Sequence, residues 1–103
     1  MTIETTAVIQ ASVRRMFPDT TIDQALTELL LERVQRNLVK YRSMARLFEA
    51  RYDQSFDEFR KAVLRQHPAA DVEQDYFDWE LAVTGIADME DEIVRLKKLA
   101  AQP

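Results

Sequence analysis

The segment EQDYFDWELAVTGI, residues 73–86, decides the fold that we expect for this chain. It contains the only tryptophan, Trp79, and the only glycine, Gly85. Apolar residues in and beside the segment recur at alternating steps of four and three, which places them on one side of a helix; they are Val72, Tyr76, Trp79, Val83 and Ile86. Three carboxylates lie off this stripe, those of Asp75, Asp78 and Glu80. The segment therefore predicts a helix with one packing side and an acidic flank.

The composition favours a single all-α domain over residues 1–103. With 103 residues, of which 47% are hydrophobic, the chain can bury one core. One Gly and three Pro leave few residues for hairpin turns, which argues against a β-rich fold. Because there is no Cys, disulfides, thiolate metal sites and thiol nucleophiles are excluded.

Capping signals divide the first half of the chain into two helices. A short helix is expected within residues 1–17, because Pro18 disfavours a helical conformation at Phe17. The sequence TIDQ at 21–24 matches a capping box and opens a long helix, expected over residues 21–53. Its apolar positions keep helical spacing without an intervening Gly or Pro; they are Leu26, Leu29, Leu30, Val34, Leu38, Tyr41, Ala45, Phe48 and Tyr52.

Two further helices are expected in the second half. The sequence SFDE at 55–58 is a second capping box and opens a short helix over residues 55–67. Asp71 repeats the cap pattern and predicts a last long helix over residues 71–101. We expect this helix to continue through Gly85, which would then admit a close contact with another helix; a kink at Gly85 is the alternative.

The two long helices are expected to form an antiparallel hairpin with short bracing helices, and so a helical bundle. The first of them, with roughly thirty residues, would be about 45 Å long. A compact chain of this size has a radius of gyration of only about 13 Å. Each long helix must therefore pair along its length, within the chain or with a second copy, and we expect a homodimer.

The aromatic residues of the opening segment have different expected roles. Trp79 is interpreted as core, because a large aromatic on the packing stripe of a helix supplies packing energy. Successive helical residues diverge by about 100°, so Phe77 is the aromatic expected to face outward. An exposed Phe77 with Asp75, Asp78 and Glu80 around it would form an apolar anchor with a charged rim, which makes these four residues the candidate partner-binding site.

Charge is distributed unevenly along the chain. Residues 1–51 carry 8 Lys/Arg and 6 Asp/Glu, whereas residues 52–103 carry 6 and 12. Three cations share one face of the first long helix: Arg33, Arg36 and Lys40. A solvated, ion-paired face is the first interpretation. The alternative is a DNA-binding or transcriptional regulatory module that uses this face together with Arg14 and Arg15.

No catalytic residue, cofactor or metal ligand is expected, so we expect a protein that is not an enzyme. Metal sites in helical bundles combine Glu with Glu-x-x-His, a motif that is missing around Asp75 and Asp78. The only histidine, His67, precedes Pro68 at a helix end, where a solvated position is expected. No secretory signal and no stretch of membrane-spanning length are found, so a cytoplasmic location without membrane contact is expected.

Three stretches of the chain resemble one family of short helical bacterial and archaeal proteins: FPDTTIDQALT at 17–27, RYDQSFDEF at 51–59, and EQDYFDWELAVTGI at 73–86. The family is that of the TumA-like antitoxins of type II toxin–antitoxin pairs, which act beside a TumE-like toxin. The resemblance implies a non-catalytic protein that binds and neutralises a small cognate toxin, expected to be a nuclease. It also implies that the complex with the toxin binds operator DNA.

On this chain the resemblance makes residues 75–80 the candidate toxin contact, because an acidic helix can cover a basic RNA-binding surface. The chain departs from the family in two ways. Asp53 stands where many members have Gly in a turn. In addition, the sequence predicts order almost to Pro103, whereas many antitoxins have a DNA-binding domain followed by a disordered tail. This difference argues against binding of the chain to its own operator. A homodimeric scaffold without a toxin is the third hypothesis.

Overall fold

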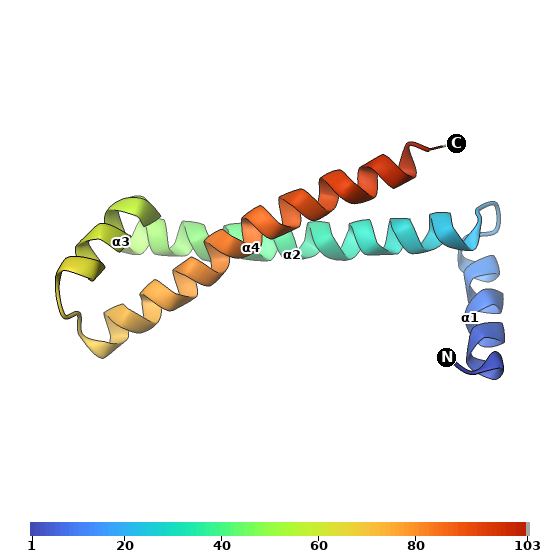
Figure 1. Ribbon diagram of the computed structural model, residues 1–103, viewed down its shortest axis with the longest axis horizontal. Helices are drawn as coiled ribbons and strands as arrows, with labels where there is room; N and C mark the ends of the chain where they lie inside the picture. The colour runs from blue at the N-terminus through green and yellow to red at the C-terminus, as the bar shows by residue number, and fades with distance from the viewer. Residues whose placement is uncertain (103) are drawn as a thin grey trace.

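The computed structural model describes residues 1–102, and within them the fold is all-α, with four helices and no strand (Figure 1). The helices are α1 (Ile3–Met16), α2 (Ile22–Tyr52), α3 (Phe56–Arg65) and α4 (Ala70–Ala100). The long helices α2 and α4 pack against each other as an antiparallel hairpin, as expected, and α3 braces one end. All four ranges lie within two residues of those expected from the sequence.

The helix α4 continues through Gly85, which lies against Tyr41 of α2. A Cβ atom at this position would come within 2.7 Å of ring atoms of Tyr41 on α2. Since carbon atoms in contact lie about 3.5–4.0 Å apart, only Gly allows the tyrosine ring to lie directly against the α4 backbone. The expected close helix contact at Gly85 is thus confirmed.

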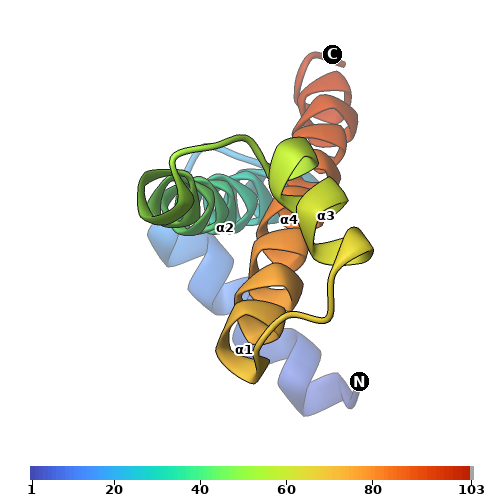
Figure 2. The same ribbon diagram turned by 90° about the vertical axis from the view of Figure 1, so that its left-hand side faces the viewer.

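An aromatic cluster forms the core where α2 ends and α4 begins, which we call the closed end. Trp79 is fully buried there, with its ring centroid 5.8 Å from that of Phe48 and 5.1 Å from that of Phe59. Tyr52 and Phe56 also pack on Trp79. Figure 2, which views the molecule from this end, shows α3 lying beside the first turns of α4. The interpretation of Trp79 as a core residue is confirmed.

The helix starts follow the capping signals at α2 and α3 but not at α4. Thr21 and Gln24 form both hydrogen bonds of a capping box, and the Ser55 hydroxyl accepts from the backbone N–H of Glu58. The assignment of Asp71 as the cap of the last helix is wrong, because α4 already begins at Ala70 and no side chain caps it. The Asp71 carboxylate instead accepts a bond from the N–H of Val72, inside the first turn.

At the other end, which we call the open end, α4 diverges from α2 and α1 projects from the body (Figure 1). Leu26, Leu29 and Leu30 are 44–53% exposed there, although they continue the apolar stripe of α2. In α1 only Val13 is buried. The radius of gyration is 19.8 Å, which exceeds the value of about 13 Å for a compact chain of this length. The apolar stripe of α2 is therefore covered only where α4 lies on it.

Candidate functional site

The outward side of α4 near the closed end carries two exposed apolar side chains. Phe77 is 53% exposed and Leu81 is 56% exposed, and residues four apart on a helix are neighbours on its surface. The outward orientation expected for Phe77 is thus confirmed. The ring of Phe77 packs edge-on against that of Tyr76, at a centroid distance of 5.6 Å, which ties the exposed ring to the aromatic core. We call the surface formed by Phe77 and Leu81, together with Glu73, Asp78 and Glu80, the outer α4 face.

Carboxylates dominate the whole first part of α4. Between residues 66 and 94 there is no Lys or Arg. The same segment contains these acidic residues: Asp71, Glu73, Asp75, Asp78, Glu80, Asp88, Glu90, Asp91 and Glu92. Within residues 1–102 only two of them pair with a cation of α2, Asp75 with Arg51 and Glu90 with Arg42. None of the carboxylates of the outer α4 face forms an ion pair within residues 1–102, although Arg60 of α3 lies near the Tyr76 hydroxyl that donates to Glu80.

Two of the expected partner-binding carboxylates lie beside Phe77 and are only partly engaged. The Gln74 amide donates to Asp78 at 3.0 Å, and the Tyr76 hydroxyl donates to Glu80 at 3.0 Å. The bond to Glu80 is also the main reason that the pKa of Tyr76 is raised. Because each carboxylate accepts at several positions, both keep free oxygen lone pairs for a basic partner.

Asp75 does not belong to this exposed surface, which corrects its expected role beside Phe77. Its side chain is only 19% exposed, and one oxygen, Oδ2, accepts bonds from the Tyr52 hydroxyl at 2.5 Å and from Arg51 Nη1 at 2.8 Å. The bonds from Tyr52 and Arg51 lower the pKa of Asp75. The Tyr52 hydroxyl, bonded to the carboxylate and partly buried, has its pKa raised to about 12. Asp75 thus fastens α4 to the end of α2.

The basic residues of α2 form a second exposed surface, the basic α2 face, which consists of Arg33, Arg36 and Lys40. None of the three forms an ion pair within residues 1–102, whereas two other cations of α2, Arg42 and Arg51, pair with the acidic last helix as expected. Two exposed leucines lie at the ends of the basic α2 face, Leu29 and Leu47.

The structure does not bring Arg14 and Arg15 to the basic α2 face. They occupy the last turn of α1, and the segment 17–21 joins this turn to the first residue of α2. Arg33 is eleven residues further along α2, a distance of about 16 Å. Arg15 donates to the Ser12 hydroxyl at 3.2 Å. The candidate nucleic-acid residues therefore form two separate groups.

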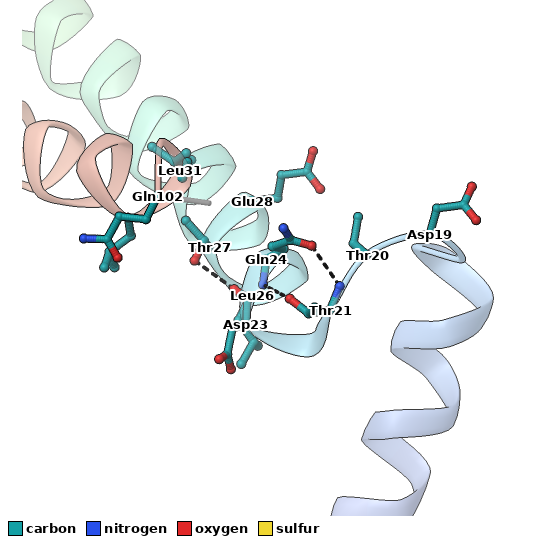
Figure 3. A pocket seen from close by; sticks show the side chains of 12 residues that line it. Asp19, Thr20, Thr21, Asp23, Gln24, Leu26, Thr27, Glu28, Leu31 and Gln102 are labelled. Atoms are coloured by element: carbon teal, nitrogen blue, oxygen red, sulfur yellow. Dashed lines mark hydrogen bonds between the residues drawn. The ribbon is translucent and has the colours of Figure 1, made fainter.

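An open groove of about 920 Å³ lies at the open end, between the start of α2 and the last turns of α4 (Figure 3). Leu26, Leu31 and Leu99 give it an apolar part. Asp19, Asp23 and Glu28 line it as well. Sequence reasoning missed this groove because its two sides are about seventy residues apart in the chain. It also missed Leu81, although the step of four from Phe77 was a usable signal.

Residues 1–102 contain no group of three or more His, Cys, Asp or Glu side chains placed to hold a metal ion. His67, after α3, is exposed. No helix in this part of the chain combines the length and the apolar composition needed to cross a membrane.

Comparison of the chain with protein-family models, curated proteins and solved structures finds no match. The residues of the chain itself are consequently the basis for inferring its function, and the resemblance to the TumA-like antitoxins stays a prediction.

Proposed function

We propose that this chain is a non-catalytic, antitoxin-like protein that binds a small basic partner protein through its outer α4 face. The observation that carries the proposal is the exposed pair Phe77 and Leu81 beside carboxylates that form no ion pair within residues 1–102. The partner class that this surface fits is a cationic protein. The resemblance to TumA-like antitoxins narrows the proposed partner to a toxin, and a nuclease has the basic surface that is needed.

The outer α4 face combines the two kinds of contact that protein interfaces use. Buried aromatic side chains at the centre of an interface commonly contribute most of the binding energy, and Phe77 can fill such a central position. Charged groups at the rim add specificity and accelerate association, which is the role we propose for Asp78 and Glu80. A nuclease evolved to bind a polyanion offers the complementary charge.

The inner side of the same helix is fixed, which favours binding without rearrangement. Trp79 anchors α4 in the aromatic core, and Asp75 fastens it to the end of α2. A surface held in its bound conformation loses less entropy on association. Replacement of the exposed Phe77 should for the same reason leave the fold intact. Because Glu80 also accepts a bond from the buried Tyr76, the melting temperature of each charge-reversal variant is compared with that of the wild type before binding is measured.

The test is capture of partners by the tagged full-length chain in its own cells, followed by mass spectrometry. The wild-type protein is expected to recover a small basic protein that the variant Asp78→Lys/Glu80→Lys fails to recover. Glu32→Lys, which makes the same kind of charge change at an exposed position of α2, is the control and should retain the partner. Equal recovery by all three proteins would contradict the proposed surface.

A second candidate function is binding of duplex DNA, favoured by the unpaired cations of the basic α2 face. It is compatible with the first, because the two surfaces lie on different helices and a toxin complex could use both. Neutralising three phosphates with Arg33, Arg36 and Lys40 predicts that the logarithm of affinity falls with the logarithm of salt with a slope of about −2.7. Gel-shift titrations across salt test this, and a triple charge reversal at these residues should abolish the slope. Sequence-preferring binding by the free protein at moderate salt would favour the regulator over the antitoxin.

A further inference from the structure

The chain exposes much more surface than a self-contained domain of its mass. Its accessible surface is 8016 Å², whereas a compact monomer of 12.0 kDa exposes roughly 6,000 Å². The excess of about 2,000 Å² is more than twice the roughly 800 Å² that each partner buries in a standard protein interface. Nine of the exposed large apolar side chains lie in the helices of the open end: Ile3, Val8, Ile9, Met16, Leu26, Leu29, Leu30, Val94 and Leu99. The surface needed for a stable interface is therefore present, and it is concentrated at one end.

Helix α1 has little support from its own chain. It has 14 residues, of which only Val13 is buried. Isolated helices of this length are marginal in water. Ile9 and Met16 lie on the same side as Val13, at steps of four and three, and are 40% and 74% exposed. Of the three apolar side chains on this side of α1, only the middle one, Val13, is therefore buried by the rest of the chain.

The groove at the open end offers a complementary surface. Leu26 of α2 and Leu99 of α4, which are 45% and 55% exposed, both line it. Asp19, Asp23 and Glu28 make its lining acidic. The last turn of α1 is basic, with Arg14 and Arg15. Helix and groove therefore match both in apolar character and in charge.

The α1 helix of the same chain is poorly placed to fill this groove. In Figures 1 and 2 it leaves α2 on the side opposite to the C-terminal end of α4. Only residues 17–21 connect it to α2, and Asp19, Thr20 and Thr21 themselves line the groove. Thr21 is in addition held in the capping box. A helix from another molecule does not have these restrictions.

We propose that the occupant is a second copy of this chain, with α1 of each protomer docked in the groove of the other. Such an exchange is isologous, since the same surface supplies both the helix and the groove, and it closes as a twofold dimer. Ile9 and Met16 would contact the leucines of the partner groove, and Arg14 and Arg15 would meet its carboxylates. The inference does not depend on the toxin-binding proposal, because it uses the opposite end of the molecule.

The first test is the mass of the full chain in solution, measured by light scattering or sedimentation. A dimer of about 24 kDa is expected, twice the 12.0 kDa of the chain. Ile9→Asp and Leu26→Asp should each weaken self-association by about tenfold or more, because a charge replaces an apolar side chain at the interface. Val39→Asp is the matched control, since Val39 is 64% exposed on α2 and lies outside the groove, and it should remain dimeric. Circular dichroism verifies that each variant keeps its helices.

A charge-exchange experiment tests which surfaces meet. The variants Arg14→Glu/Arg15→Glu and Asp19→Lys/Glu28→Lys should each self-associate weakly, because like charges then face each other. When the two variants are mixed, both contacts of the mixed dimer pair opposite charges, so association should be restored. A monomeric wild-type chain would overturn the proposal, whether its α1 helix projects from the body or docks in the groove of its own chain. So would a dimer that is insensitive to Ile9→Asp and Leu26→Asp, or a mixture that shows no restoration.

Discussion

The bond from Tyr52 to Asp75 allows the attachment of α4 to α2 to be tested with a single atom. Tyr52→Phe removes the hydroxyl and keeps the ring, whose centroid lies 4.4 Å from that of Phe59 and 6.2 Å from that of Trp79. A hydrogen bond to a charged group contributes about 1.5–3 kcal/mol. Arg51 still binds the same carboxylate oxygen in the variant, and water reaches the partly exposed Asp75. We therefore expect the low end of the range, a loss of about 1.5 kcal/mol.

For a chain of this length, 1 kcal/mol corresponds to roughly 4–8 °C in melting temperature. Tyr52→Phe should consequently lower the melting temperature by roughly 6–12 °C, measured by circular dichroism at neutral pH and equal protein concentration. Tyr41→Phe is the control. Unlike the hydroxyls of Tyr52 and Tyr76, that of Tyr41 has no hydrogen-bond partner within residues 1–102, so its loss should change stability by less than about 0.5 kcal/mol.

The same bond predicts how the stability difference depends on pH. The pKa of Tyr52 is about 12 in the folded protein and 10.0 ordinarily. A group with a raised folded pKa contributes stability fully below its unfolded pKa and loses it as pH rises through the folded value. The gap between wild type and Tyr52→Phe should thus be constant from neutral pH to about pH 10 and shrink between pH 10 and 12. A variant as stable as the wild type at neutral pH would refute the attachment.

Three further substitutions probe the fold. Trp79→Ala should cost about 3–5 kcal/mol in urea denaturation, because it empties the centre of the aromatic core; a loss below about 1 kcal/mol would contradict that position. Gly85→Ala should destabilise by about 1 kcal/mol, since overpacking against Tyr41 outweighs the gain in helix propensity, and this cost should vanish when Tyr41 is replaced by Ala. Asp75→Asn should destabilise at pH 7. Because the folded pKa of Asp75 is lowered, the stability that it contributes is present above its unfolded pKa of about 4 and is lost as pH falls through the folded value. The difference from wild type should therefore be smaller at pH 3 than at pH 7, and a gap that does not narrow would disprove the role of the charge.

Local signals in the sequence were sufficient for most of the helices. The capping box at Thr21 forms with both of its hydrogen bonds, and the continuous helix through Gly85 follows from the uninterrupted spacing of apolar residues around it. The opposite orientations of Trp79 and Phe77 follow from the helical period alone. The start of α4 was misplaced because Asp71 matches a cap pattern that the backbone does not use.

Features that depend on how two helices cross could not be predicted from the spacing of apolar residues in one helix. Leu30 and Val34 belong to the same apolar stripe of α2, yet Leu30 is 53% exposed and Val34 is 8% exposed. The difference arises because α4 diverges from α2 beyond their crossing, and a crossing angle depends on the side chains of both helices. The inward position of Asp75 has a similar origin, since it requires the end of α2 to place Arg51 and Tyr52 beside it.

Calorimetric titration of the captured partner measures directly whether the outer α4 face binds a basic protein. Wild type, Phe77→Ala and the control Glu32→Lys are compared after their melting temperatures have been shown to agree. If Phe77 is the central anchor, its truncation costs about 2 kcal/mol or more, so the affinity of Phe77→Ala should fall by about 30-fold or more. Glu32→Lys should bind like the wild type. Equal affinity for wild type and Phe77→Ala would show that the partner binds elsewhere than at the outer α4 face.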